Sequence, residues 1–265
     1  MLTEASRALM SRSAKTYTLS VRGVLFMFLL VCPWILGFFL HLVIFMGAEV
    51  AQGGATLYEN LVLWYFQGFW LPLATLFTGV ALVADDAEGG TLPYLFGRPV
   101  RRRTILLAKF AGVSAVLIAE TLVSLAGTYV ICWSEAGFGQ VFRNLDALVL
   151  DAVVLTLGIL VYGALFSFLG VALKKPLLWG FFIGFGWENL VGWLPGFLKR
   201  FTVLFHLHTL KPSGNMPEFL QQLLASTESK LAAILFLAGY FVLFLFLSCW
   251  FMGRMEAPAQ EREGG

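Results

Sequence analysis

Long apolar runs, separated by short charged segments, constrain the fold of this chain more than any other feature of its sequence. A bilayer core is crossed by about 20 apolar residues in helical form, and the backbone inside it must satisfy its own hydrogen bonds. Runs of this kind occupy residues 24–45, 58–84, 104–133, 147–173, 177–194 and 231–252. The sequence therefore predicts an all-α polytopic membrane protein with six transmembrane helices, forming a single domain over residues 1–265.

Composition and missing motifs narrow the function. Charged residues make up 13% of the chain, against about 25% in a typical soluble domain, which excludes a water-soluble enzyme. The phosphate-binding pattern G-x-x-x-x-G-K-[ST] and common catalytic motifs do not occur. The cysteines Cys32, Cys132 and Cys249 have no metal-binding spacing. We expect no catalytic residue, no metal site and no nucleic-acid partner, and any ATP that drives the protein must be bound by a separate chain.

The distribution of Lys and Arg predicts the orientation. Thirteen of the 18 basic residues lie in segments that would share a side with the N-terminus, and five lie in the other segments. Because Lys and Arg are enriched in cytoplasmic loops, both termini are predicted to be cytoplasmic. The protein is then expected to be a multi-pass protein of the cytoplasmic (inner) membrane.

Three segments outside the spans are expected to have distinct roles. Residues 1–22 combine scattered basic residues with a modest apolar face, which favours an interfacial helix; a frayed tail is the alternative. Residues 195–230 form the long extracytoplasmic loop, and their apolar part predicts short helices in the outer leaflet. Residues 253–265 are a charged cytoplasmic tail.

The segment 85–103, between the second and third spans, is the most informative. The acidic residues Asp85, Asp86 and Glu88 are followed by two glycines, and Thr91 can then cap a short helix with Pro93 in its first turn. An apolar face of this helix would lie beside a cluster of arginines. We interpret the segment as a cytoplasmic helix that docks on a partner; a loop lying on lipid phosphates is the alternative.

The same segment resembles a known family. Residues Glu88-Gly89-Gly90-Thr91-Leu92, then Leu95, Arg98-Pro99-Val100, Arg101 and Lys109, are similar to the E-x-G-T-L…L…R-P-[VI]-x-R…K pattern of ABC-2-type permeases. The six-span topology resembles that family over nearly the whole chain. A second stretch, Trp187-Glu188-Asn189-Leu190 running to Lys199-Arg200, is similar to a pattern found in part of the family.

This resemblance implies a function and partners. The chain would be the transmembrane subunit of an ABC transporter, with a coupling helix that docks on a separate ATPase, which would bind ATP and Mg²⁺. A second permease subunit, identical or homologous, would complete the pathway, and membrane lipids and periplasmic or surface accessory proteins are further expected partners. The residues assigned to ATPase coupling are Glu88, Gly90, Thr91, Leu92, Tyr94, Leu95, Phe96 and Arg98.

Acidic residues inside the spans are candidates for the translocation pathway, because charge within a bilayer is costly. Glu120 lies near the middle of the third span, where it could also be a protonated or hydrogen-bonded acid between packed helices. Asp151 and Glu188 lie toward the outer ends of their spans. They could instead face the outer interface or pair with Arg143, Lys199 or Arg200.

Two other functions remain open at this stage. Some relatives of this kind of permease support metalloenzyme maturation or surface motility, and a membrane scaffold without an ATPase is a third interpretation.

The histidines His206 and His208 have no acid or cysteine beside them, so a surface role is favoured over a metal site. Nothing in the sequence identifies the substrate.

Overall fold

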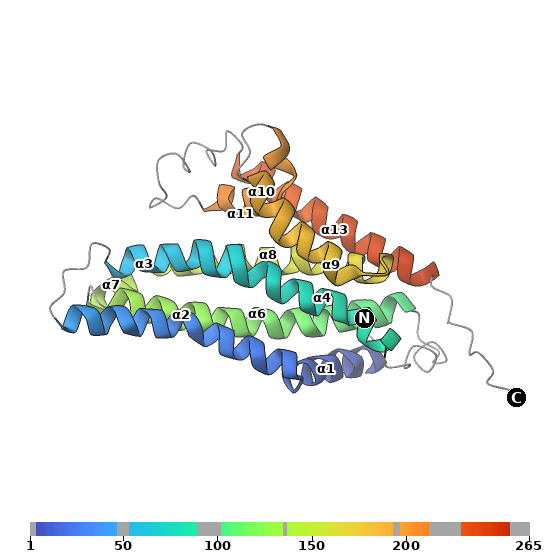
Figure 1. Cartoon of the computed structure of the whole chain (residues 1–265), viewed down its shortest axis with the longest axis horizontal. Helices are drawn as coiled ribbons and strands as arrows, with labels where there is room; N and C mark the ends of the chain where they lie inside the picture. Colours follow the sequence, from blue (N-terminus) through green and yellow to red (C-terminus); the bar gives the residue numbers. More distant parts are fainter. Residues whose placement is uncertain are drawn as a thin grey trace, which may run out of the picture.

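A computed structural model describes residues 4–46, 53–88, 102–134, 137–192, 197–211 and 229–254 of the chain. Within these residues the structure is helical, and Figure 1 shows a bundle of long helices with a smaller group of short helices to one side. The all-α prediction is confirmed for this part of the chain. Five of its helices are long and apolar enough to cross a membrane: 21–43, 54–82, 102–134, 145–172 and 230–254.

The N-terminal part of the chain packs along the third predicted span. Helix α1 (Glu4–Thr18) and helix α2 (Val21–Phe45) follow one another along α6 (Arg102–Ser134), as Figure 1 shows. The indole of Trp34 donates a hydrogen bond to the carbonyl of Ser124 at 2.8 Å, and the hydroxyl of Ser124 donates to the carbonyl of Leu30 at 2.6 Å. These bonds satisfy polar groups inside an apolar interface, so they fix the register of α2 on α6.

The second predicted span is built from three consecutive helical segments. They are α3 (Gly54–Asn60), a π-helical stretch η1 (Leu61–Trp70) and α4 (Leu71–Glu88). The helix therefore continues through the acidic pair Asp85 and Asp86, beyond the end predicted at residue 84. Its middle is held to α6 by the indole of Trp70, which donates to the hydroxyl of Thr121 at 3.0 Å.

The fourth predicted span, α8 (Leu145–Ala172), packs very closely against α4. A Cβ atom on Gly79 would lie 2.9 Å from Cβ of Phe166, and one on Gly170 would lie 3.0 Å from the backbone of Val80. Only glycine permits so close an approach of two helices. The short helix α7 (Phe138–Arg143) connects α6 to α8, and the hydroxyl of Tyr129 donates to the carbonyl of Val141 at 2.7 Å.

The fifth predicted span, 177–194, is described only as far as Gly192. It consists of α9 (Pro176–Phe181), a π-helical stretch η2 (Phe182–Trp187) and α10 (Glu188–Gly192). Its apolar part covers only Pro176–Trp187, which is less than the ~20 residues that a full crossing needs. Five crossings are thus supported, and the sixth stays a prediction.

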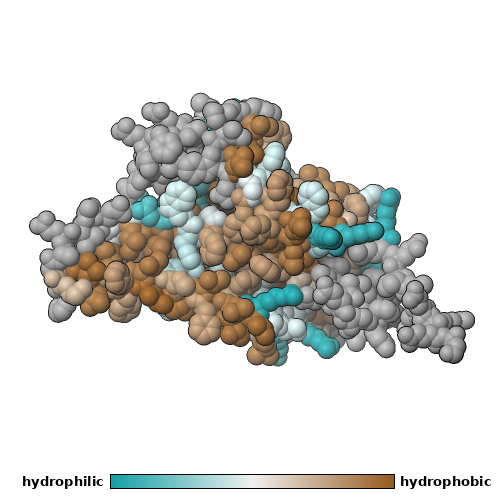
Figure 2. Space-filling model, in the orientation of Figure 1, coloured by the Kyte–Doolittle hydropathy of each residue, from teal (hydrophilic) through white to brown (hydrophobic). Residues whose placement is uncertain are grey.

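The last described segments return to the same end of the molecule as the N-terminus. A 3₁₀ turn η3 (Phe197–Phe201) and α11 (Val203–Leu210) precede the long helix α13 (Lys230–Arg254). Helix α13 packs on α8, where the hydroxyls of Ser167 and Ser248 are 3.0 Å apart and hydrogen-bonded. Figure 2 shows hydrophobic residues over much of the visible bundle, with hydrophilic residues gathered toward the end of the bundle at which α4 and α13 end. The interfacial location of α1 at a membrane surface stays a prediction.

Candidate functional site

Most of the predicted coupling residues lie outside the part of the chain that the structure describes. Glu88 is the last residue of α4. Gly90, Thr91, Leu92, Tyr94, Leu95, Phe96 and Arg98 all fall in the segment 89–101, outside the described ranges. The structure does describe the two helices that flank this segment, α4 before it and α6 after it.

The two flanking helices are joined beside the segment by a lysine of the family pattern. The ammonium of Lys109, on α6, donates a hydrogen bond to the carbonyl of Leu82, on α4, at 3.3 Å. Leu82 is buried in a small apolar cluster with Leu106, Phe110 and Met252. Helices α4, α6 and α13 therefore share one core at this end.

Basic and N-terminal elements converge on the same end. The guanidinium of Arg103 lies against the end of α13, because a Cβ on Gly253 would be 3.3 Å from its Nε. The backbone of α1 approaches α6 so closely that a Cβ on Gly112 would lie 2.5 Å from the carbonyl oxygen of Met10. Figure 1 shows the end of α4, the start of α6 and the end of α13 at this end of the bundle.

Asp151 lies at the opposite end of α8 and is fully buried. Its Oδ2 accepts a hydrogen bond from the hydroxyl of Tyr58 at 2.8 Å and an ionic hydrogen bond from Lys211 at 2.5 Å. The predicted partners Arg143, Lys199 and Arg200 were therefore wrong for this residue. The correct partner is Lys211, which directly follows α11, because α11 packs on α8 and so brings this lysine to the carboxylate.

Glu188 is also buried, and it acts on the backbone of α11. Its two carboxylate oxygens accept hydrogen bonds from the amides of Val203 and Leu204, each at 3.1 Å. The first amides of a helix have no partner within the helix, and a carboxylate there is further stabilised by the helix dipole. The prediction that Glu188 faces the outer interface or pairs with an arginine or lysine is corrected: it caps α11.

Helix α11 is thus held at both ends by carboxylates from other helices. Glu188 of α10 holds its first turn, and Asp151 of α8 holds Lys211, which follows its last residue. Between them, the ring of His206 stacks on Phe236 of α13 with 3.8 Å between ring centroids. Among the residues that the structure describes, no three His, Cys, Asp or Glu side chains come together as a metal site would require.

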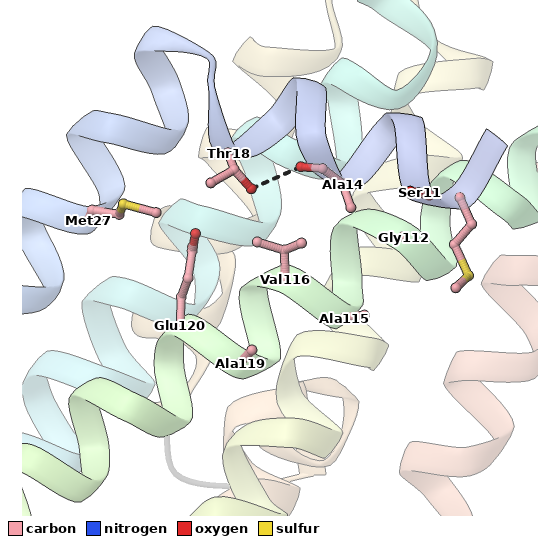
Figure 3. A pocket seen from close by; sticks show the side chains of 10 residues that line it. Ser11, Ala14, Thr18, Met27, Gly112, Ala115, Val116, Ala119 and Glu120 are labelled. Atoms are coloured by element: carbon pink, nitrogen blue, oxygen red, sulfur yellow. Dashed lines mark hydrogen bonds between the residues drawn. The ribbon is translucent and has the colours of Figure 1, made fainter. Parts of the chain in front are cut away.

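Glu120 is separate from this outer cluster. Its side chain extends from α6 toward Thr18 and Met27, at the junction of α1 and α2 (Figure 3). Both carboxylate oxygens are covered, and neither has a hydrogen bond of good geometry. The three acids that the sequence suggested for a pathway do not form one site: two hold α11, and the third faces a cavity beside α1.

Sequence reasoning missed Tyr58 and Lys211. Tyr58 was treated only as the first residue of a span, and Lys211 only as one of five outer basic residues. The available signal was the acid itself, since a buried Asp needs a cation or hydrogen-bond donors close by. Choosing Lys211 among the outer cations required knowing that the stretch 203–210 forms a helix folded onto the bundle.

Comparison with known proteins agrees with this architecture. Residues 66–257 match the family described as ABC-2 family transporter protein, which covers more than half of the chain. No protein of curated function matches the sequence. The matched region runs from the second predicted span through the flanking helices of the coupling segment to the end of α13. This chain is therefore a multi-pass membrane protein that belongs to the ABC-2 family of transporter proteins.

Proposed function

We propose that this chain is the transmembrane subunit of an ABC transporter that couples ATP hydrolysis by a separate ATPase to export of a substrate. The ATPase would bind ATP and Mg²⁺ and would dock on segment 85–103. A second copy, or a homologous subunit, would complete the pathway in the cytoplasmic membrane, with both termini in the cytoplasm. The proposal is supported most directly by one observation: the helices on either side of the coupling segment are joined by Lys109 and Leu82.

This tie determines how a push on the segment would travel. A segment anchored on two independent helices could move without moving the bundle. Here both anchors belong to one apolar core that includes Leu106 and Met252, so force on the segment moves α4, α6 and α13 together. Packed cores shift between discrete arrangements rather than deform continuously. The short apolar helix that the sequence predicts beside the basic residues would be well suited to transmit force in this way.

The close contact between α4 and α8 would carry the motion toward the other end of the bundle. Gly79 and Gly170 permit backbone contact with no flexible side chain between the helices, and such a contact transmits displacement. At the outer end of α8, Asp151 holds Lys211 beside α11. We infer that α11 moves with α8 and covers or uncovers the outer end of the pathway when the ATPase closes.

The proposal is tested by replacing Glu88 with Ala in the complex of this chain with its ATPase. The purified complex, reconstituted into lipid nanodiscs, is expected to keep its ATPase subunit but to lose most of the permease-dependent stimulation of ATP hydrolysis. Asp146→Asn, an acid-to-amide change at an exposed position on α8, serves as the control. Stimulation by Glu88→Ala equal to wild type would contradict the coupling role.

Two further measurements separate the alternatives. A photoactivatable residue at position 94 should crosslink to a protein with an ATP-binding motif, and capture of no such protein would favour a scaffold. Cysteines placed at positions 91 and 103 should react with a membrane-impermeant maleimide only after the membrane is opened. If they react in intact cells, the segment faces outward and the proposed orientation is wrong.

A further inference from the structure

A cavity of about 420 Å³ lies between α1, α6 and the first turns of α2. This volume is within the ~300–1,000 Å³ range of small-molecule sites. Its walls are mainly apolar, formed by Met10, Met27 and Val116 together with alanines of α1 and α6. Ala115 and Ala119 are exposed on α6, so the cavity opens sideways between α1 and α6. An occupant would therefore enter from the side of the bundle with an apolar chain against these walls.

One wall of the cavity carries an acid with unsatisfied hydrogen-bonding capacity. Figure 3 shows Glu120 extending from α6 toward Thr18 and Met27. Neither oxygen has a hydrogen bond of good geometry, and the hydroxyl of Thr18 donates instead to the carbonyl of Ala14 at 2.9 Å. A buried acceptor without a donor costs free energy, and a charged one costs more. The site is therefore complete only when something else supplies donors to this carboxylate.

The neighbouring tyrosine cannot satisfy the carboxylate alone. The hydroxyl of Tyr17 is covered and lies close enough to interact with Glu120. Burial, the nearby charge of Glu120 and side-chain hydrogen bonding to Glu120 raise the pKa of this phenol well above its usual range. A phenol has one proton to donate, whereas a carboxylate has two oxygens with several acceptor sites. Even with Tyr17 turned toward it, Glu120 would retain an unsatisfied oxygen.

The charges that line the cavity favour one class of ligand. None of the residues that line it is Lys, Arg or His. An anionic amphiphile would therefore be repelled by Glu120 and would find no counter-charge. An alcohol would supply a single donor. A primary ammonium supplies three donors and a full positive charge, and hydrogen bonds between charged groups are about twice as strong as neutral ones.

We propose that this cavity binds an amphiphile with a primary ammonium group, which Glu120 holds while the apolar chain lies along Met10, Met27 and Val116. The proposal does not depend on how the protein is coupled to ATP. It assigns to Glu120 a ligand-binding role at the side of the bundle, away from the cluster formed by Asp151 and Lys211.

The test uses photoreactive dodecylamine, with photoreactive dodecanoic acid and dodecanol as comparison probes, on the full-length protein in nanodiscs. At matched bilayer concentrations, the amine should label peptides of α1 and α6 about tenfold more than the acid, because a charge-assisted hydrogen bond is gained. Glu120→Gln should reduce amine labelling about tenfold and leave dodecanol labelling nearly unchanged. Asp146→Asn should label as wild type does.

A second variant keeps the test decisive if Glu120→Gln fails to fold. Ala115→Phe fills the exposed mouth of the cavity without changing charge, and it should reduce labelling by all three probes at α1 and α6. Equal labelling by the amine and the acid in the wild-type protein would overturn the proposal. So would amine labelling that neither Glu120→Gln nor Ala115→Phe reduces.

Discussion

The ammonium of Lys211 lies 2.5 Å from Oδ2 of Asp151, and this ion pair joins the end of α11 to the N-terminal half of α8. Asp151 is fully buried and Lys211 is 16% exposed. The same oxygen accepts a hydrogen bond from Tyr58, so three helical segments meet at one carboxylate. The ion pair thus sets the position of α11 relative to the bundle, and removing the pair should lower the stability of the protein.

Replacing Asp151 with Asn is therefore expected to destabilise the protein. Breaking one member of a buried ion pair costs about 3–5 kcal/mol, because the remaining charge stays buried without its partner. Thermal unfolding in nanodiscs should show a clear loss for Asp151→Asn and a smaller loss for the double variant Asp151→Asn with Lys211→Gln. If Asp151→Asn unfolds at the same temperature as the exposed control Asp146→Asn, the ion pair does not stabilise the fold.

The cap on α11 makes a separate prediction. Glu188→Ala removes the acceptors of the amides of Val203 and Leu204, and loss of a helix cap costs about 1–2 kcal/mol. Hydrogen–deuterium exchange of residues 203–210 should become about tenfold faster, while exchange in α6 stays unchanged. Glu188→Gln keeps one acceptor oxygen, so its exchange rate in residues 203–210 should lie between those of the wild type and Glu188→Ala. Unchanged exchange in Glu188→Ala would show that another group holds the helix.

The positions of the long spans could be predicted from the sequence because they depend on one local property, a run of apolar residues. The run 104–133 became α6 over Arg102–Ser134, and the run 231–252 became α13 over Lys230–Arg254. The predicted ends are within two residues of the observed ones. The helix of the second span extends to Glu88, past the predicted end at residue 84, because a helix can continue beyond the apolar run that crosses the bilayer.

The partners of the buried acids could not be predicted in the same way. They depend on how α11 folds back, which is a contact between residues 60 positions apart in the sequence for Asp151 and Lys211. Apolar periodicity describes which residues avoid water, but it does not state which helix covers them. The coupling residues were suggested by a family pattern, and they stay predictions because all of them except Glu88 lie in 89–101, outside the described ranges.

Glycine substitutions test the close contact between α4 and α8. A Cβ on Gly79 would lie 2.9 Å from Cβ of Phe166 and 3.1 Å from the backbone nitrogen of Ser167, and such overpacking typically costs about 1–3 kcal/mol. Gly79→Ala should therefore lower the unfolding temperature. Gly239→Ala on α13, where a Cβ would meet nothing within 4 Å, should raise stability by about 0.5–1 kcal/mol. Equal effects of the two would mean that α4 and α8 are further apart.

Acid should weaken the packing of α11 through His208. Burial lowers the pKa of this histidine to about 4, against about 6.5 in the unfolded chain. Above pH ~6.5 both states are neutral and the full stability is present. As the pH falls from about 6.5 toward 4, the unfolded state binds the proton first, so stability decreases. His208→Gln should reduce this pH dependence of the unfolding temperature, whereas an unaltered dependence would point to another group.

The tie between Lys109 and Leu82 gives the sharpest test of how the coupling segment works. Lys109→Met keeps most of the aliphatic stem but removes the donor to the carbonyl of Leu82. The loss of one such hydrogen bond costs about 1 kcal/mol, so the protein should still insert and bind its ATPase. Because α4 and α6 could then move separately, permease-dependent stimulation of ATP hydrolysis should fall about fivefold, the change in an equilibrium that corresponds to about 1 kcal/mol.

Two variants control this measurement. Lys109→Arg retains a donor and a positive charge and should recover part of the stimulation. Arg143→Met, at the end of α7 on the opposite side of the bundle, removes a cation far from the segment and should leave stimulation as in wild type. If Lys109→Met and Arg143→Met behave alike while both complexes retain the ATPase, force must pass from the segment through α4 or α6 individually. The proposal that α4 and α6 move together would then be wrong, whereas the proposal that the ATPase docks on this segment would not be affected.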